Sequence, residues 1–422
     1  MAGSILVAGG RSRAQQAPVV AMRRPTMVQR WLRERCCGRL RQLRSGAVTL
    51  RDADGQRTVG APDGPLGTIV VDVQDPAFWS AVAQSGDIAV GETFVTGQWS
   101  CSDLVGLLRL FVRDRSVLLD LDGSLWAWPR RLLLRAWQGL RRNSRPGSER
   151  NIVDHYDLGD DLFAHFLDPS MTYSSAWFEH DGQSLADAQG AKLDRLCRLV
   201  DLQRGDRLLE IGTGWGSLAL HAAGQCGAQV TTTTISRNQF TRASERVAAA
   251  GLQERVQLLQ RDYRDIDGTF DKLLSCEMVE AVGARFLPTY LKACAARLRP
   301  GGVLGLQAIT IADRHYDSAL RAVDYIKRHV FPGSFIPSVQ VLVETAKAHT
   351  DLQLEHHEDF GPHYATTLQL WREQVLRHPQ PFLQRGGESL LRAWQYYFAY
   401  CEAGFRERHI GVGHFRFRRT GG

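Results

Sequence analysis

The sequence predicts an α/β protein whose larger part is built on a mostly parallel β-sheet. Strand-like and helix-like segments alternate from residue 207 to residue 309, the pattern of a parallel sheet with right-handed crossovers. The first strand, residues 208–211, runs directly into a glycine-rich turn and then into a helix that starts at residue 217. A strand that ends in such a turn is typical of the ligand-binding edge of an open α/β sheet.

The glycine turn has the sequence GTGWG, with glycine at positions 212, 214 and 216. Glycine tolerates the backbone angles of a tight turn and lets a ligand approach the bare backbone. The spacing is neither that of a dinucleotide fingerprint nor that of a phosphate-binding P-loop. Glu210 at the end of the strand favours a cationic ligand over a pyrophosphate. Taken alone, the segment is also compatible with a glycine turn in another α/β fold.

Length and composition indicate a globular protein of two or three domains. The chain has 422 residues, of which 44% are hydrophobic, and a net charge of +7 that favours an anionic partner, either nucleic acid or a membrane surface. The eight cysteines form no C-x-x-C pair, so we expect neither a zinc site nor a disulfide framework, and a reducing compartment fits. A run of about 18 or more apolar residues is absent, which predicts no transmembrane helix.

Four parts are expected along the chain. Residues 1–25 form a disordered tail, residues 26–125 a small α+β domain, residues 126–150 a basic amphipathic linker helix, and residues 151–422 the larger domain. In the linker, tryptophans and leucines alternate with arginines, which suits a lipid headgroup interface. An interdomain helix with a solvated basic face is the alternative for that segment.

The small domain combines helices with short strands. Its predicted elements are a basic helix at 28–43, strands at 47–50 and 68–73, a helix that opens after Asp75 with Pro76 in its first turn, and an apolar helix at 104–112.

The larger domain alternates strands and helices and then adds a helical insertion. After residues 208–211, strands are predicted at 228–235, 256–260, 270–276, 303–309, 353–360 and 409–418. Helices are predicted at 238–250, 286–298, 366–377 and 389–405, with the insertion at 312–347.

Polar side chains follow the ends of these strands, where a ligand binds in an open sheet. Thr234 and Gln239 offer neutral donors and acceptors after the second strand, and Tyr263 follows the third strand, where its ring is suited to cover a flat purine. Glu277 and Glu280 follow the fourth strand. Glu280 is the better candidate for holding a catalytic group, and Glu277 fits a supporting residue or a cap equally well.

A series of motifs carries a resemblance to one family. On these motifs the chain is similar to the cyclopropane-fatty-acyl-phospholipid synthases and the mycolic acid cyclopropane synthases. From residue 151 to residue 418 they follow the family's order, and GETFVTGQW resembles the lipid-associating amino-terminal domain of longer members. The motifs are HYDLGDDLF, FLDPSMTYSSAWF, EIGTGWGSLA, TISRNQ, QRDYRD, EMVEAVG, YIKRHVFPGSFIPS and FGPHYATTLQLW.

The resemblance implies a Rossmann-like class I methyltransferase dependent on S-adenosylmethionine (SAM), with a seven-stranded, mostly parallel sheet, helices on both faces, and a smaller α+β amino-terminal domain. The family transfers the SAM methyl group to a cis double bond of a phospholipid acyl chain. A bound bicarbonate then removes a proton from the carbocation, and a cyclopropane ring closes. The implied location is cytoplasmic and peripheral to the inner membrane, with unsaturated phospholipid acyl chains as partners and no nucleic acid. A homodimer is left open.

The resemblance also implies two sets of site residues and no metal. The set that would hold SAM consists of Tyr173, Ser174, Gly212, Gly214, Thr234, Gln239 and Tyr263. The set that would form the bicarbonate pocket consists of Ser175, Glu280, Gln307, Ile309 and Tyr364. Glu280 would orient the proton on bicarbonate, and Tyr364 would donate a hydrogen bond to it.

Three positions depart from the best-known members of the family. Those members usually carry cysteine at Ser175, histidine at Gln307 and histidine at Ala281. Ser175 and Ile309 are expected to contribute backbone groups, and Gln307 donates a hydrogen bond without carrying charge. The EMVEAVG motif resembles that of a subgroup of the family that includes enzymes forming methyl- or methylene-branched chains. Both a cyclopropane ring and a branched chain therefore stay open as the product. A soluble small-molecule substrate, a lipid-binding protein with a decayed site and, from charge alone, a nucleic-acid methyltransferase stay open as well.

Overall fold

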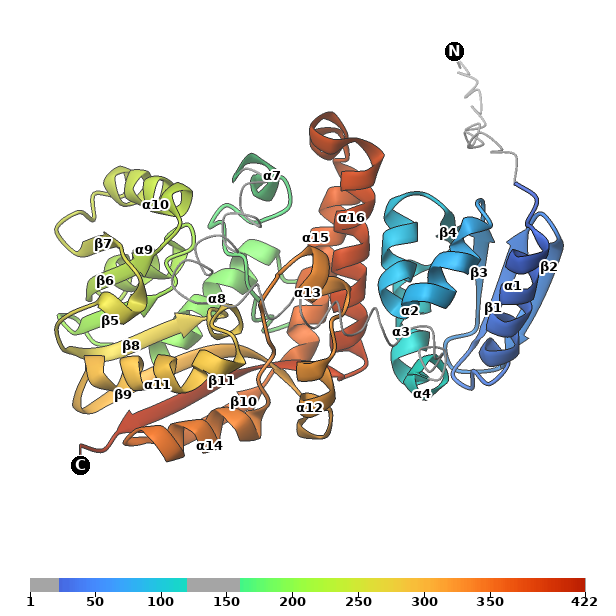
Figure 1. Ribbon diagram of the computed structural model, residues 1–422. Coiled ribbons are helices and arrows are strands. Elements are labelled where there is room, and N and C mark those ends of the chain that lie inside the picture. The colour runs from blue at the N-terminus through green and yellow to red at the C-terminus, as the bar shows by residue number, and fades with distance from the viewer. Residues whose placement is uncertain (1–22, 120–159, 422) are drawn as a thin grey trace, which may run out of the picture.

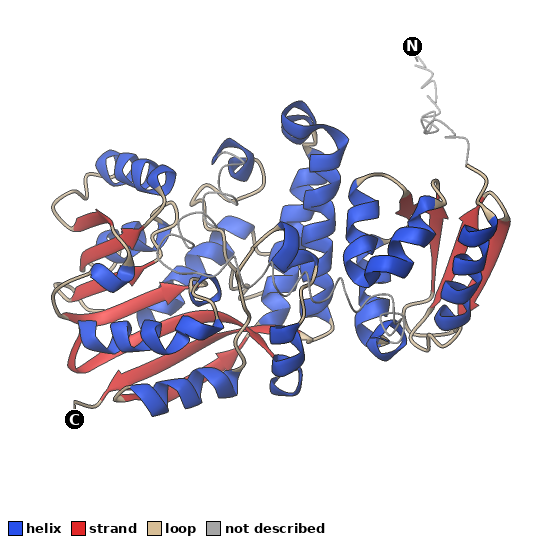
Figure 2. Ribbon diagram, in the orientation of Figure 1, coloured by secondary structure: helices blue, strands red, loops and turns tan. Residues whose placement is uncertain are grey.

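The computed structural model describes residues 23–119 and 160–421, and each of these two parts contains one β-sheet (Figure 1). The amino-terminal part contains a four-stranded sheet of order β2-β1-β3-β4, and the larger carboxyl-terminal part contains a seven-stranded sheet of order β10-β11-β9-β8-β5-β6-β7. Figure 2 shows helices on both faces of the larger sheet. Most of the predicted tail and the whole predicted linker helix lie outside the described residues.

The amino-terminal unit, residues 27–119, places its helices on one mixed sheet. β1 pairs antiparallel with β2 and parallel with β3, and β3 pairs antiparallel with β4. The predicted strand at 68–73 is found at those residues. The elements are α1 (Met27–Leu40), β1 (Ala47–Asp52), β2 (Gly55–Gly60), β3 (Thr68–Val73), α2 (Ala77–Val95), β4 (Trp99–Cys101), α3 (Leu104–Arg113) and α4 (Arg115–Leu119).

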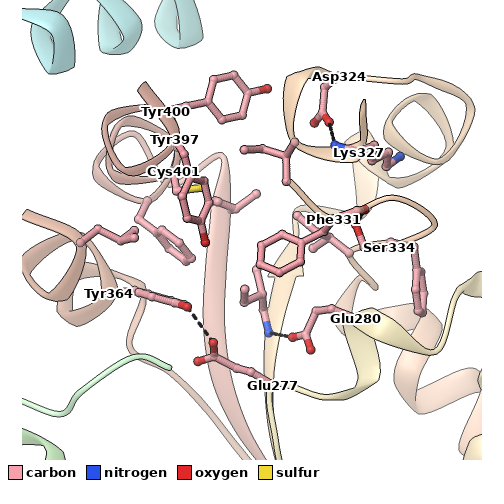
Figure 3. A pocket seen from close by; sticks show the side chains of 18 of the residues that line it. Glu277, Glu280, Asp324, Lys327, Phe331, Ser334, Tyr364, Tyr397, Tyr400 and Cys401 are labelled. Atoms are coloured by element: carbon pink, nitrogen blue, oxygen red, sulfur yellow. Dashed lines mark hydrogen bonds between the residues drawn. The ribbon is translucent and has the colours of Figure 1, made fainter. Parts of the chain in front are cut away.

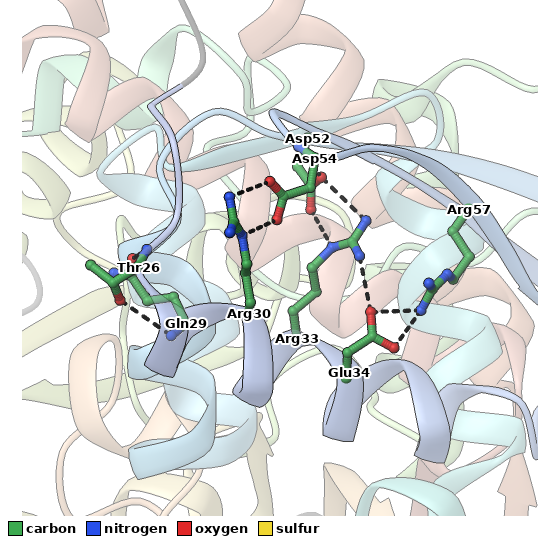
Figure 4. A network of polar contacts seen from close by, with 8 residues as sticks. All are labelled: Thr26, Gln29, Arg30, Arg33, Glu34, Asp52, Asp54 and Arg57. Atoms are coloured by element: carbon green, nitrogen blue, oxygen red, sulfur yellow. Dashed lines mark hydrogen bonds and ion pairs between the residues drawn. The ribbon is translucent and has the colours of Figure 1, made fainter.

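Ion pairs fix α1 to the β1–β2 hairpin (Figure 4). Arg30 donates to both oxygens of Asp54 at 2.9 and 3.1 Å, and Arg33 donates to both oxygens of Asp52 at 2.6 and 3.2 Å. The Arg33–Asp52 pair is buried, with side-chain exposures of 7% and 6%. Arg33 therefore fixes α1 to the sheet and is not available to an anionic partner, whereas the side chain of Arg30 is 52% exposed.

The seven-stranded sheet confirms the predicted α/β class. β5, β6, β7, β8 and β9 run parallel, and β11 runs antiparallel to both β9 and β10. Its strands are β5 (Arg207–Ile211), β6 (Gln229–Thr234), β7 (Val256–Gln260), β8 (Phe270–Cys276), β9 (Leu298–Ile311), β10 (Leu352–Asp359) and β11 (Ile410–Arg419). The α-helices of this part are α7 (Asp160–Ala164), α8 (Leu185–Leu199), α9 (Ser217–Gly224), α10 (Arg237–Ala249), α11 (Leu287–Arg297), α12 (Asp313–Arg321), α13 (Tyr325–His329), α14 (Val339–His349), α15 (Gly361–Arg377) and α16 (Gln380–Arg406).

The largest differences from the sequence expectation are the starting residues of three elements. β9 begins at Leu298 rather than at residue 303, because Leu298 pairs with Phe270 ahead of a register shift. α15 begins at Gly361, before the predicted start at residue 366, with proline in its first turn. α16 begins at Gln380 rather than at residue 389, and its non-helical angles at Gly386 and Gly387 interrupt the pattern that predicted only its second part.

α16 joins the two parts of the molecule (Figure 1). Its Tyr396, Ala399 and Ala403 belong to the same hydrophobic cluster as the core of the amino-terminal unit. Arg392 donates to the carbonyls of Phe94 and Trp99 at 2.5 and 2.7 Å. In the part of the chain that the structure describes, every helix is too short or too polar to span a bilayer.

Candidate active site

One cavity of about 870 Å³ extends from the edge of the large sheet to the amino-terminal unit. At one end its walls include the glycine turn, Glu277 and Glu280, and at the other end they include apolar side chains such as Trp79 and Leu107. The volume lies within the usual range for small-molecule sites. The cavity thus has a polar end and an apolar end.

The glycine turn presents its backbone to the polar end. Gly212, Gly214 and Gly216 have φ angles of 100°, 52° and 87°, which lie in the left-handed region. A Cβ atom on Gly214 would meet no described atom within 4 Å, so its outer side is open. The N–H groups of Gly212 and Thr213 both donate to the carbonyl of Thr233 at 3.1 Å, which fixes the turn to β6.

Glu210 lies buried beneath this turn. One of its carboxylate oxygens accepts a hydrogen bond from the Thr232 hydroxyl at 2.5 Å, and that hydroxyl lies 2.7 Å from the hydroxyl of Thr213. Burial raises the pKa of Glu210 to about 8. A cationic ligand close by would favour the ionised form again.

The seven residues predicted to hold SAM all line this cavity. Thr234 donates its hydroxyl hydrogen bond to the side-chain carbonyl of Gln239 at 2.8 Å. Tyr263 packs edge-on against Tyr290, and burial raises the pKa of its phenol to about 12, so it is neutral. The hydroxyl of Tyr173 lies 3.0 Å from that of Tyr397 on α16.

Lys192 on α8 is a buried charge that no sequence motif indicated. Its ammonium group donates to the hydroxyl of Ser174 at 2.7 Å and lies 3.7 Å from the sulfur of Cys276. The residue occupies an ordinary position of an amphipathic helix, so its helical spacing gave no signal.

Three predicted site residues converge on Glu277, and Figure 3 shows the hydrogen bond from one of them, Tyr364. One carboxylate oxygen accepts the backbone N–H of Ser175 at 2.9 Å and the side-chain amide of Gln307 at 2.8 Å. The other oxygen accepts the hydroxyl of Tyr364 at 2.7 Å. The backbone of Glu277 has a φ angle of 49°, a strained value for a residue with a long side chain.

Glu280 lies beside Glu277 but has different partners (Figure 3). One of its oxygens accepts the backbone N–H of Ile309 at 2.6 Å, and the other is buried without a hydrogen-bond partner among the described residues. Burial first, and the neighbouring charge of Glu277 second, raise the pKa of Glu280 to about 8. A pKa near 8 favours the protonated carboxyl at neutral pH.

A chain of polar groups that leads from buried His414 to the partly exposed Glu358 and Arg195 lies behind Gln307. The side-chain oxygen of Gln307 lies 3.0 Å from Nε2 of His414, and Nδ1 of His414 lies 3.1 Å from Glu358. Glu358 also pairs with Arg195 at 2.9 Å. The hydrogen bond from His414, followed by Arg195, lowers the pKa of Glu358 to about 2. His414, Glu358 and Arg195 lie on β11, β10 and α8, outside every motif, so the sequence did not indicate them.

The five residues predicted to bind bicarbonate form two groups instead of one. Ser175, Gln307 and Tyr364 hold the Glu277 carboxylate, whereas Glu280 and Ile309 bond to each other. Ser175 and Gln307 are fully buried and do not line the cavity. The donors expected for bicarbonate therefore do not fit that ion in this structure, because a side chain of the protein occupies them.

Comparisons with known proteins agree on one family. Residues 143–415 match the family model described as mycolic acid cyclopropane synthetase. The chain is 37% identical over 378 residues to tuberculostearic acid methyltransferase UfaA1 of Mycobacterium tuberculosis, covering 87% of each protein. It is 33% identical over 350 residues to cyclopropane-fatty-acyl-phospholipid synthase of Escherichia coli, covering 82% of this chain and 87% of the relative. The solved structure of mycolic acid cyclopropane synthase CmaA1 with SAH and CTAB is similar at a TM-score of 0.60 and 28% identity, covering 64% of this chain and 98% of that one.

Proposed function

The chain belongs to the mycolic acid cyclopropane synthetase family and is a SAM-dependent methyltransferase, and on this premise we propose that it methylates the double bond of unsaturated acyl chains in membrane phospholipids. The proposed product is a cyclopropane fatty acid. One observation carries the proposal: a single cavity joins the glycine turn to an apolar region long enough to reach the amino-terminal unit. A charged methyl donor and an apolar methyl acceptor need a cavity with a polar end and an apolar end that are connected.

The glycine-turn end fits SAM. The open backbone at Gly214 admits a ligand, Glu210 suits its positive charge, and Tyr263 is suited to cover a flat ring. When bound, SAM supplies a methyl group that leaves its bonding electrons on sulfur. The residues around the turn bind and orient the donor, and the acyl chain reacts in the rest of the cavity.

The other end fits an alkene, which is a poor nucleophile. Such a reaction needs close orientation and the exclusion of water. Phe331 and Tyr397 lie across the cavity from the two glutamates, with their rings 6.0 Å apart (Figure 3). Aromatic faces stabilise a nearby cation by ~0.5–2 kcal/mol per contact. These rings therefore favour a positively charged acyl chain without supplying a nucleophile that would capture it.

The outer face of α1 supports an approach to a membrane surface. Met27, Val28 and Trp31 are 86%, 64% and 56% exposed, and the guanidinium of Arg35 lies 4.8 Å from the ring of Trp31. Exposed apolar and aromatic side chains beside arginine suit an anionic headgroup interface. Cys36 and Leu40 of the same helix line the cavity, so one helix carries the proposed surface at its start and part of the apolar end of the cavity toward its end.

The test is a product analysis. The protein is incubated with SAM and vesicles that contain oleoyl phospholipid, and the released acyl chains are analysed by mass spectrometry after ozonolysis. An acyl chain that has gained the mass of one CH₂ and is no longer cleaved by ozone supports the cyclopropane product. No change in the acyl chains, with methylation of a soluble compound or of RNA instead, would contradict the proposal.

A second candidate is the formation of a methyl or methylene branch at the same double bond. The similarity to a protein named tuberculostearic acid methyltransferase favours it, as do Gln307 and Ala281 at positions where the best-known ring-forming members carry histidine. Ozonolysis separates ring from methylene branch, because the branch is cleaved and the ring is not.

A further inference from the structure

We propose that the Glu277 carboxylate is the base of the reaction and takes the place that the family resemblance assigns to bicarbonate. This inference rests on the proposed function and adds to it the identity of the proton acceptor. It makes the enzyme independent of dissolved carbonate.

The first argument is the donor set around Glu277. A backbone N–H, a side-chain amide and a phenol hydroxyl converge on its two oxygens at 2.9, 2.8 and 2.7 Å. Two or three such donors are what a protein needs to hold a buried anion. Ser175, Gln307 and Tyr364 are the same residues that the resemblance assigned to a carbonate-type anion. The carboxylate of Glu277 has a similar shape and charge, and it is covalently attached.

The second argument is position. Glu277 and Glu280 both reach the cavity from the segment after β8, opposite Phe331 and Tyr397 (Figure 3). Glu277 adopts its left-handed backbone angle of 49° and thereby aims its side chain at the donors. Strain of this kind is retained where the surrounding structure demands it, and it is frequent at functional sites.

The third argument is the orientation of the Gln307 amide. Its NH₂ group faces Glu277 at 2.8 Å and its oxygen lies 3.0 Å from Nε2 of His414, which donates to that oxygen while Nδ1 donates to Glu358 when both ring nitrogens carry a proton. The opposite orientation would place an amide oxygen 2.8 Å from the carboxylate. His414, held by Glu358, is therefore a positioning residue that keeps a donor on the base.

The proton transfer balances without any further reactant. Methyl transfer to one alkene carbon leaves a positive charge on the other alkene carbon, adjacent to the carbon that carries the new methyl group. Glu277 accepts a proton from that methyl group, and the C–H bonding pair forms the C–C bond that closes the ring. For a branch, a hydride first migrates to the cationic carbon, and the same C–H pair becomes a C=C bond. When the product leaves, the proton passes from Glu277 to water. Burial raises the pKa of Glu277, which makes it a better base than an exposed carboxylate.

The experiment measures acyl product formation by the full-length enzyme in buffer depleted of carbon dioxide and in the same buffer with added bicarbonate. We expect the wild-type rate to change by less than about twofold. We expect Glu277→Gln to lower kcat by roughly 10²–10⁴-fold, the usual contribution of a general base, with unchanged SAM binding by calorimetry. Glu245→Gln, at an exposed surface pair on α10, is the matched control and should keep the wild-type rate.

A second variant guards against loss of folding. Glu277→Gly suits the left-handed backbone angle and empties the donor set, so we expect formate or bicarbonate to restore part of its activity. A wild-type enzyme that needs bicarbonate, or a Glu277→Gln variant with full activity, would overturn the inference while leaving the methyltransferase proposal intact. A wild-type enzyme that alters no acyl chain in either buffer would overturn both.

Discussion

The two parts of the polar end of the cavity are built in different ways. At the glycine turn, the groups that face a ligand come from one short stretch, residues 210–216, and most of them belong to the backbone. Around Glu277, the groups come from residues 175, 277, 307 and 364, which lie on separate elements. The first part is a local structure, and the second exists only after the chain has folded. The comparison predicts that they respond differently to substitution.

At the local part, the expected effect is a loss of SAM affinity. Gly214→Val places a β-branched residue at a φ angle of 52°, which costs roughly 1–3 kcal/mol and also covers the open backbone. We expect SAM affinity, measured by calorimetry, to fall by about 10–100-fold, since ~1.4 kcal/mol is a tenfold change. Gly190→Ala on α8, where a Cβ meets no described atom within 4 Å, is the control and should bind SAM normally. Equal losses for both variants would contradict the assigned role of the turn.

Glu280→Gln tests the carboxyl group that lies beside the convergent part. We expect turnover to fall about tenfold or more while the SAM dissociation constant changes by less than about twofold, because the group acts on the reaction rather than on the donor. Steady-state kinetics and calorimetry measure the two quantities. Equal losses of turnover and affinity would place Glu280 at the SAM site instead.

The same variant has a pH signature in stability. The pKa of Glu280 is about 8 in the folded protein, above the ordinary value of a glutamate, so the folded state binds more protons than the unfolded state and this contribution is lost as pH rises toward 8. Glutamine does not titrate. The melting temperature of Glu280→Gln relative to wild type should therefore increase between about pH 5 and pH 9. A constant difference would show that Glu280 is not buried as described.

Tyr364→Phe is expected to have a pH-dependent effect. The Tyr364 hydroxyl lowers the pKa of Glu277, and its loss raises that pKa, so less carboxylate is ionised at low pH. A hydrogen bond to a charged group contributes about 1.5–3 kcal/mol, so we expect at least about a tenfold loss of kcat near pH 6 that shrinks toward pH 9. Tyr316→Phe on α12, which does not line the cavity, is the control. A loss of equal size at both pH values would contradict the link to Glu277.

The smallest effect is expected outside both parts. Trp31→Ser removes an exposed ring from α1, and we expect binding to anionic vesicles in co-sedimentation to fall by a few-fold, while activity on detergent-dispersed lipid stays unchanged. Unchanged vesicle binding would remove α1 from the proposed membrane surface. Leu376→Ser, another exposed apolar position, provides the comparison.

The sequence predicted most of the fold, with different success in different elements. Strands at 68–73, 256–260 and 270–276 were predicted with the observed bounds. α16 was predicted only in part, because Gly386 and Gly387 hide the continuity of its two segments. The family was confirmed, since its motifs are long and occur in order. The domain boundaries and the linker helix stay predictions.

The sequence by itself determined the succession of strands and helices, the glycine turn and the class of donor, because each depends on residues that are neighbours in the chain. Only the tertiary structure decided which group the buried donors hold. The left-handed backbone of Glu277 brings its carboxylate to Ser175, Gln307 and Tyr364, and His414 arrives behind Gln307 from a strand 107 residues further along the chain. The spacing of residues along the chain does not predict this convergence, because the convergence depends on how the strands pair and on which side chain reaches the donors.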